Sequence, residues 1–171
     1  MMRRASLSVA VLGLLCLVGC PRDPVPGTQK FNIAMDFTLR DADDVEHSLS
    51  DYAGDVVWLQ FLRADCGAAC EPVVEDSEQF YQDRKDQGFT IITVLIGSEA
   101  DAAQCATFTS ANGLTFPVLY NNSPDDAWGL YNDRDKIPLN IVLTRDQIIW
   151  YKNIGYFPSN IGNIVYSALQ E

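Results

Sequence analysis

The sequence feature that most constrains the fold is an apolar run that ends in a turn and two cysteines. Residues 56–62, Val-Val-Trp-Leu-Gln-Phe-Leu, are rich in strand-forming residues and few enough to form one buried strand. Residues 63–65 predict a turn, and Cys66 and Cys70 then stand where an amphipathic helix begins. Because the N-terminus of a helix stabilises thiolate, the pattern predicts a redox site or a soft-metal site.

The spacing of the two cysteines limits the conformation of the turn between them. Three residues separate Cys66 from Cys70, so the cysteines are four positions apart. In a regular helix such residues have Cβ atoms about 5–6 Å apart, whereas a disulfide needs about 3.5–4.5 Å. We therefore expect Cys66 at a non-helical cap position, or a distorted first turn. Gly67 supplies the backbone freedom that either arrangement needs.

Strand and helix patterns alternate along the rest of the chain. The predicted strands cover residues 37–41, 89–96, 116–120, 139–144 and 148–154. The predicted helices cover a short turn at 48–54, then 99–111, 124–131 and a last helix from Ser159. Helices between buried strands, with a hairpin near the end, predict an α/β fold with a central mixed β-sheet flanked by helices.

Local signals add three expectations about these elements. Residues 37–41 alternate in the manner of an edge strand. Ser98, with Asp101 three positions later, forms a capping-box pattern and predicts the start of the second long helix. Ser159 predicts the N-cap of the last helix.

The N-terminus has the pattern of a targeting signal. Arg3 and Arg4 precede an apolar run at residues 7–18, which is too short to span a bilayer comfortably. The run ends in Leu-Val-Gly before Cys20. This ending resembles the lipobox of bacterial lipoproteins, in which the cysteine becomes the lipidated N-terminus of the mature protein. We therefore predict lipidation of Cys20.

The predicted organisation is a signal peptide at 1–19, a tether at 20–34 that begins at the lipidated cysteine, and one domain at 35–171. Prolines and a glycine make the tether a short spacer. We expect a lipoprotein of the bacterial cell envelope that faces the periplasm or the exterior, where thiols meet oxidants.

The charge balance argues against a nucleic-acid partner. The 171 residues include 12 basic and 23 acidic side chains, and the net charge is -11. Phosphate contacts need clustered Lys and Arg, so we expect an acidic, solvated surface instead.

Five cysteines are present, and the pattern separates them by role. Cys16 lies in the predicted signal peptide and Cys20 at its end. Cys66 and Cys70 form the pair, and Cys105 is left over. We expect Cys105 to be a small buried side chain.

The order of motifs resembles the thioredoxin-like redoxins. In chain order the motifs are DFTL, SLSDYAGDVVWLQF, the cysteine pair, GFTIITVLI, GLTFPVL and IPLNIVL. They are most similar to the branch of TlpA-like and AhpC/TSA-type proteins, over about residues 35–169. The resemblance implies a thioredoxin-like fold and thiol–disulfide exchange. It also implies that Pro138 is a cis proline that faces the cysteines, shapes the groove and keeps metals from the thiols.

The chain departs from the family pattern around the cysteines. The family usually has two residues between them, and it has a tryptophan where this chain has Asp65. The proline and threonine of peroxiredoxins would fall at Leu59 and Arg63, which argues against a peroxidase centred on Cys66.

The three-residue spacing is shared with the Sco-type copper proteins, and this similarity implies an alternative function. Cys66 and Cys70 would then bind Cu(I), since soft thiolates suit this ion. Sco-type sites add a histidine downstream of the cysteines, whereas His47 lies upstream and is expected to be a solvated surface residue. A thioredoxin-like scaffold without turnover is a third hypothesis.

The favoured hypothesis is an exported, lipid-anchored thiol–disulfide oxidoreductase. Cys66, at the tip of the helix, is the expected nucleophile, and Cys70 is expected to resolve the mixed disulfide. The reaction needs no cofactor, and the expected partners are thiol or disulfide proteins of the cell envelope. We expect a monomer.

Glu71 is expected to be an exposed acid in the first helical turn. Packing roles are expected for Trp128, Trp150 and Tyr151.

Overall fold

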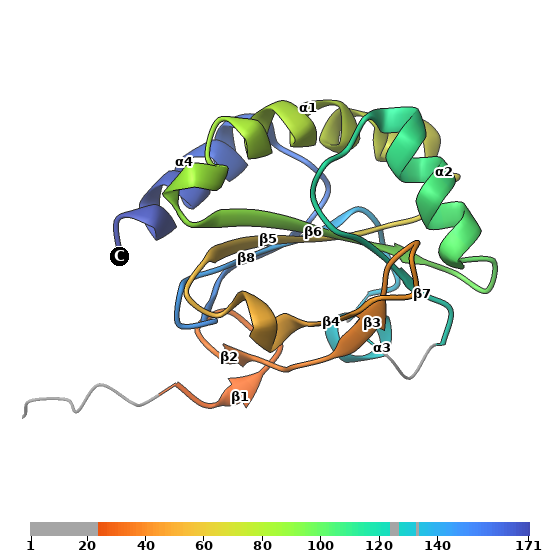
Figure 1. The fold of residues 1–171 in the computed structure, drawn as a ribbon. Helices are drawn as coiled ribbons and strands as arrows, with labels where there is room; N and C mark the ends of the chain where they lie inside the picture. Colours follow the sequence, from red (N-terminus) through yellow and green to blue (C-terminus); the bar gives the residue numbers. More distant parts are fainter. Residues whose placement is uncertain (1–23, 124–126, 133) are drawn as a thin grey trace, which may run out of the picture.

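The computed structural model describes residues 24–123, 127–132 and 134–171 (Figure 1). The predicted signal peptide, with Cys16, and the predicted lipidation site Cys20 lie outside the described residues. Among the helices of the described ranges, none is both long enough and apolar enough to cross a bilayer.

A mixed β-sheet, seven strands wide within the described residues, forms the centre of the molecule. In order across the sheet, the strands are β4 (Glu46–Ser48), β3 (Thr38–Arg40), β7 (Val118–Asn121), β6 (Phe89–Ile96), β5 (Val56–Leu62), β8 (Leu139–Leu143) and β9 (Ile149–Ile154). The three central strands β5, β6 and β7 run parallel, and the outer strands join them antiparallel. The mixed sheet is therefore confirmed.

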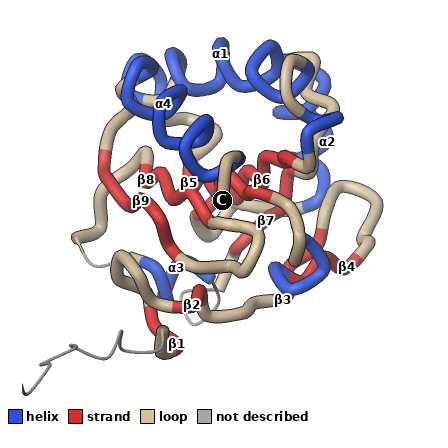
Figure 2. Tube along the Cα trace, turned by 90° about the vertical axis from the view of Figure 1, so that its left-hand side faces the viewer, coloured by secondary structure: helices blue, strands red, loops and turns tan. Residues whose placement is uncertain are grey.

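The three long helices lie over one face of the sheet (Figures 1 and 2). They are α1 (Glu71–Gln82), α2 (Ala102–Asn112) and α4 (Pro158–Leu169). The short helix α3 (Ala127–Tyr131) and the 3-10 helix η1 (Leu49–Tyr52) contribute to the core on the opposite face. Two further 3-10 turns, η2 (Gly67–Ala69) and η3 (Lys85–Gln87), precede and follow α1.

Strand β5 is buried on both faces, which explains its continuous apolar sequence. Val56, Trp58 and Leu62 belong to the core beneath the long helices. Leu59 and Phe61, which point the other way, belong to the core on the opposite face. A parallel strand covered on both sides needs apolar side chains in both directions.

The predicted capping box at the start of α2 is wrong. The helix begins after Asp101, whose carboxylate accepts a hydrogen bond from the backbone N–H of Gln104 at 2.7 Å. Ser98 lies in the turn before this cap. Both residues are good N-caps by type, but only Asp101 stands three positions before a free helical N–H.

The predicted cap of the last helix is also wrong. Phe157 is the N-cap of α4, and Pro158 occupies the first turn, so the helix starts before Ser159. The fixed φ of proline suits a first helical turn, where its missing N–H is not needed.

The prediction of an edge strand at residues 37–41 is wrong as well. Strand β3 is not an edge strand, because β4 pairs with it on the outer side. The polar residues of β4 carry no apolar alternation that would have revealed it. Helix α1 ends at Gln82, and the η3 turn then leads to Gly88, whose φ of 72° lies in the left-handed region that glycine adopts readily.

The last residues of the predicted tether contact the sheet. β1 (Pro26–Gly27) and β2 (Ile33–Ala34) form a short parallel pair. The Phe31 N–H donates to the Ile149 carbonyl at 2.8 Å, and the Ile149 N–H donates to the Asn32 carbonyl at 2.9 Å. This segment therefore lies along the beginning of β9.

Candidate functional site

The cysteine turn, residues 63–70, connects β5 to α1. Cys66 precedes the η2 turn, and Cys70 is the N-cap of α1. The Cys70 N–H donates to the Gly67 carbonyl at 2.8 Å, and Gly67 has a φ of 50°, a conformation that glycine adopts readily. A disulfide joins the cysteines, whose Cα atoms are 5.7 Å apart. Of the two arrangements expected from the spacing, the structure has the distorted first turn, because Gly67–Ala69 form a 3-10 turn before α1 begins.

The two cysteines differ in their access to solvent. Cys70 is only 3% exposed and belongs to the core beneath the long helices. Cys66 is half-buried and lies at the edge of that core. A sulfur of another molecule can therefore approach Cys66 more readily than Cys70. The assignment of Cys66 as nucleophile stays a prediction, and this difference agrees with it.

An exposed ion pair lies within the cysteine turn. The Arg63 Nε donates to the Asp65 carboxylate at 3.0 Å, and a second guanidinium nitrogen donates to it at 3.2 Å. Asp65 occupies the position at which the family usually has a tryptophan. Its negative charge is paired with the Arg63 guanidinium.

Pro138 lies at the same end of the sheet as the cysteine turn. The Ile137–Pro138 peptide bond is cis, as the resemblance implied. The next residue, Leu139, pairs with Phe61 near the end of β5, so the sheet register brings Pro138 close to the point where the cysteine turn leaves β5. Pro138 is buried, and its carbonyl accepts a hydrogen bond from the Gly155 N–H at 2.8 Å.

A chain of buried hydrogen bonds, which we call the buried polar anchor, fixes α1 to the sheet. Thr93 of β6 donates from its hydroxyl to the Gln60 Oε1 at 2.8 Å, and the Gln60 Nε2 donates to the Ser77 hydroxyl at 2.8 Å. Ser77 in turn donates to the Val73 carbonyl one helical turn earlier. This anchor was not predicted from the sequence, although Gln60 is a polar interruption of an apolar run and could have signalled it.

A second buried side chain supports the loop around Pro138. The Trp58 indole N–H donates to the Asn140 Oδ1 at 2.9 Å, and the Asn140 Nδ2 donates to the Gly155 carbonyl at 3.0 Å. Asn140 thereby links β5 and β8 to Gly155, whose N–H donates to the Pro138 carbonyl. The role of Asn140 was not predicted from the sequence either.

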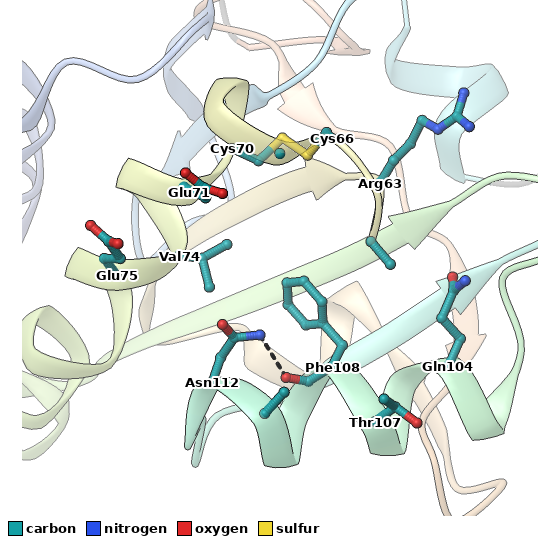
Figure 3. A pocket seen from close by; sticks show the side chains of 13 residues that line it. Arg63, Cys66, Cys70, Glu71, Val74, Glu75, Gln104, Thr107, Phe108 and Asn112 are labelled. Atoms are coloured by element: carbon teal, nitrogen blue, oxygen red, sulfur yellow. Dashed lines mark hydrogen bonds between the residues drawn. A yellow bond between two sulfur atoms is a disulfide. The ribbon is translucent and has the colours of Figure 1, made fainter.

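A pocket of about 350 Å³, the disulfide pocket, opens beside Cys66 and Cys70 (Figure 3). One wall comes from α1 and the other from α2, and the Phe108 ring stands between them. Its lining residues are Arg63, Ala64, Cys66, Gly67, Cys70, Glu71, Val74, Glu75, Gln104, Thr107, Phe108, Ala111 and Asn112. No local sequence pattern could have predicted this pocket, because the two helices that form its walls are separated along the chain by β6.

Cys105 is the small buried side chain that the sequence analysis expects. It lies in α2 and has no exposed surface. Burial is the largest cause that raises the pKa of its thiol to about 12, and the negative charges of Asp101 and Asp41 add to it. The thiol is therefore neutral at physiological pH, and Cys105 does not line the pocket beside the disulfide.

The expectation for His47 is wrong, because this residue is half-buried and hydrogen-bonded through both ring nitrogens. Its Nδ1 lies 2.6 Å from the Tyr52 hydroxyl, and its Nε2 lies 3.0 Å from the Asp41 carboxylate. Burial alone would raise the pKa of Asp41, but the hydrogen bonds from His47 and nearby backbone N–H groups outweigh burial and lower it. The pairing of β3 with β4, which the sequence did not reveal, encloses the ring.

His47 lies too far from the cysteines to share a metal with them. Strands β3, β7 and β6 separate β4 from β5, and at about 4.8 Å per step the two strands are about 19 Å apart. Within the described ranges, no three His, Cys, Asp or Glu side chains gather in a way that could hold a metal ion. The geometry therefore disfavours a Sco-type site with a histidine ligand.

The other residues that the sequence analysis singled out lie as expected. Glu71 is exposed in the first turn of α1. The aromatic side chains pack against the two cores: Trp128 on one face, and Trp150 and Tyr151 on the other.

Comparison with known proteins places these features in context. Residues 32–152 match the AhpC/TSA family. Thiol-disulfide oxidoreductase ResA of Geobacillus kaustophilus (strain HTA426) is 34% identical over 99 residues, which are 58% of this chain and 55% of that protein. "Putative peroxiredoxin Rv2521" of Mycobacterium tuberculosis (strain ATCC 25618 / H37Rv) is 34% identical over 102 residues, 57% of this chain and 62% of that protein. The chain thus spans little more than half the length of these relatives.

Solved structures show the fold. A thiol:disulfide interchange protein of the thioredoxin family from Chlorobium tepidum TLS superposes with a TM-score of 0.70 at 20% identity, over 86% of this chain and 99% of that chain. A thiol:disulfide interchange protein from Bacteroides sp. gives a TM-score of 0.69 at 19% identity, over 88% and 93%. The thioredoxin-like fold expected from the sequence is therefore confirmed.

Proposed function

Since the chain belongs to the AhpC/TSA family, we propose that it is a thiol–disulfide oxidoreductase that exchanges disulfides with protein partners. The observation that carries the proposal is the Cys66–Cys70 disulfide at the start of α1. One cysteine is accessible and the other is buried beneath the helix. This asymmetry suits a reaction in which a partner bonds to one sulfur while the second waits to displace it.

The reaction follows from the two sulfurs. In the reduced protein, the Cys66 thiolate attacks a partner's disulfide, a mixed disulfide forms, and the partner's other sulfur leaves as a thiolate and takes up a proton. The Cys70 thiolate then attacks the Cys66 sulfur, and the partner's second thiolate leaves. Two electrons pass to the partner, and its disulfide becomes two thiols. The reverse sequence oxidises a partner dithiol and needs no cofactor.

The neighbours of the disulfide have supporting roles in this proposal. Pro138, which directly precedes β8, is proposed to shape the groove beside Cys66, and its ring offers a metal no ligand. Gly67 gives the backbone of the cysteine turn the freedom to accept both the open and the bonded states.

The proposed function does not include peroxidase chemistry at Cys66. Leu59 is fully buried within β5, where it offers an approaching peroxide no polar group. Arg63 is paired with Asp65. We expect reduced protein to consume hydrogen peroxide no faster than a free thiol of similar exposure does. The loss of peroxide over time measures this rate, and reduced Cys66→Ser protein gives the background rate without Cys66.

The proposal places the protein in the bacterial cell envelope as a lipid-anchored monomer without a nucleic-acid partner. The support is the signal-like sequence at 1–19 and Cys20 at its end. Mass spectrometry of the mature N-terminus tests it. An unmodified first residue other than Cys20 contradicts the anchor and leaves the exchange chemistry untouched.

A trapping experiment tests the function and the roles of the two cysteines together. With Cys70→Ser, the mixed disulfide through Cys66 should accumulate, because no internal thiol can resolve it. Non-reducing electrophoresis and mass spectrometry would identify the bonded cysteine. Cys105→Ala, which removes the buried thiol, serves as the control and should trap nothing. If Cys66→Ser traps partners and Cys70→Ser does not, the roles are reversed.

A further inference from the structure

We propose that the disulfide pocket binds the partner's chain beside its reactive cysteine and selects a segment with one apolar and one basic side chain. The inference rests on the proposed function and goes further, because it names the kind of partner. A partner's sulfur must reach Cys66, so the residues next to that sulfur have to lie near the pocket that Cys66 lines.

The inner surface of the pocket is apolar. Val74 of α1, and Phe108 and Ala111 of α2, line it, and Figure 3 shows the Phe108 ring standing between the two helices, on the side of the disulfide. Ligand pockets in proteins commonly measure about 300–1,000 Å³ and combine an apolar lining with a few polar groups. A pocket of about 350 Å³ is at the small end of this range and suits one apolar side chain.

The α1 side of the pocket is acidic. Glu71 and Glu75 both line it, and both are exposed. Helix α1 contains no Lys or Arg, and within the described residues neither carboxylate forms an ion pair. Arg63, at the other end of the pocket, is already paired with Asp65. A Lys or Arg of the partner would therefore be attracted to the α1 side, and an Asp or Glu would be repelled.

The α2 side of the pocket offers uncharged polar groups. Gln104, Thr107 and Asn112 line it, and the Asn112 side chain donates to the Phe108 carbonyl at 2.8 Å, as Figure 3 shows. These groups can bond to the backbone of an extended segment without selecting its charge. Selection by charge therefore comes from Glu71 and Glu75 alone.

Four synthetic peptides of equal length test the proposal. Each contains one cysteine, joined by a disulfide to 2-mercaptoethanol, and its neighbours are apolar and basic, apolar and acidic, polar and basic, or polar and acidic. The measured quantity is the second-order rate at which reduced protein releases the peptide thiol. We expect the apolar and basic peptide to react about tenfold faster than the polar and acidic one, and the charge preference to shrink at high salt.

Variants locate the preference in the pocket. Glu71→Gln combined with Glu75→Gln should reduce the preference for the basic peptides by about threefold to fivefold. The matched control combines Asp43→Asn with Asp86→Asn, two exposed acids outside the pocket, which change the net charge equally and should leave the preference intact. Thr107→Lys, at an exposed pocket position, should shift the preference toward acidic peptides.

A small uncharged disulfide, hydroxyethyl disulfide, distinguishes a failure of the proposed function from a failure of the proposed peptide selection. If reduced protein reacts with neither this compound nor any peptide, the proposed function fails. If it reacts with the compound but treats the four peptides alike, the pocket selects nothing and this inference is overturned while the function stands. The inference is also overturned if the variant with Glu71→Gln and Glu75→Gln prefers basic peptides as strongly as the unchanged protein does.

Discussion

The cysteine turn and the buried polar anchor adjoin the same helix, yet they are built in opposite ways. In the turn, backbone hydrogen bonds and a solvent-facing ion pair surround Cys66. About two helical turns beyond Cys70, Ser77 of α1 is linked to Thr93 of β6 by the fully buried Gln60 of β5. The Cys66 side of the turn, which a partner's sulfur can approach, thus borders on solvent, and the helix behind it is held by the core.

This difference separates reactivity from position. A buried polar side chain must keep its partners, because an unsatisfied group in the core is costly. The anchor therefore fixes where α1 stands on the sheet. The exposed residues of the turn, 63–65 and 67–69, can change their hydrogen bonds without that cost, since water replaces any bond that they lose. The following predictions test this contrast, and the substitutions among them run from the largest expected loss of stability to the smallest.

Breaking the anchor should destabilise the protein strongly. In Gln60→Leu, the Thr93 hydroxyl loses its acceptor within the core, and we expect a loss of about 2 kcal/mol in the free energy of unfolding. Urea unfolding of the oxidised protein measures it. Adding Thr93→Val should recover more than half of the loss, because both partners are then apolar. A double variant as unstable as the single one would show that the size of residue 60, rather than its hydrogen bonds, matters. Ser110→Ala removes an exposed hydrogen bond and should cost less than about 0.5 kcal/mol.

Alkaline pH should weaken the buried regions and spare the turn, whose disulfide does not titrate. Burial raises the pKa of the Cys105 thiol from 9.0, and that of the Tyr52 hydroxyl from 10.0, to about 12. Each of the two protonated groups contributes fully to the free energy of unfolding below the pKa that it has in the unfolded chain. This contribution is lost as the pH rises toward 12. For Cys105, each pH unit above the unfolded value costs about 1.4 kcal/mol. Unfolding measured from pH 8 to 11 should show this slope, and Cys105→Ala should reduce it. An equal slope in that variant contradicts the assignment.

The two thiols Cys66 and Cys105 should differ in reactivity when the protein is reduced and folded. At pH 8, iodoacetamide should modify Cys66 within minutes and Cys105 only after the protein unfolds, because the buried thiol is both shielded and neutral. Mass spectrometry of digested protein identifies the modified residue. At neutral pH, Cys105→Ala should lower the free energy of unfolding by about 1 kcal/mol, since it leaves a small cavity. Rapid labelling of Cys105 in folded protein would show that α2 opens.

The smallest effect is expected within the turn itself. Arg63→Gln removes an ion pair whose side chains are 55% and 73% exposed, so the free energy of unfolding should change by less than about 0.5 kcal/mol. Urea unfolding beside Gln60→Leu gives the direct comparison. A loss as large as that of Gln60→Leu would mean that the turn is held by this pair and that the contrast drawn above is wrong.

Much of the fold was predictable because burial leaves a direct mark on sequence. The run from Val56 to Leu62 has apolar residues in both directions, and the strand covered on both faces is where the sequence predicts it. Ile161, Val165 and Ala168 recur at helical spacing and are the buried residues of α4. The pairing of Cys66 with Cys70 was predictable from their spacing and the turn before them.

The parts that escaped prediction depend on residues that are distant in sequence. His47 is enclosed because β3 and β4 pair, and three polar residues give no strand signal. The cap of α2 required a choice between Ser98 and Asp101, which are equally suitable by type. The disulfide pocket forms only when α1 and α2, which β6 separates along the chain, pack side by side on the sheet. The sequence around Phe108 therefore did not indicate that this residue lies near Cys66.

The segment at residues 31–34 also protects the sheet. An edge strand offers unpaired N–H and C=O groups, to which a strand of another molecule can add and begin an aggregate. Phe31 and Asn32 occupy the outward-facing groups of Ile149 at the beginning of β9. A fragment trimmed to begin after residue 34 would lose this cover, and we expect it to self-associate more readily in concentrated solution than one that begins at residue 24.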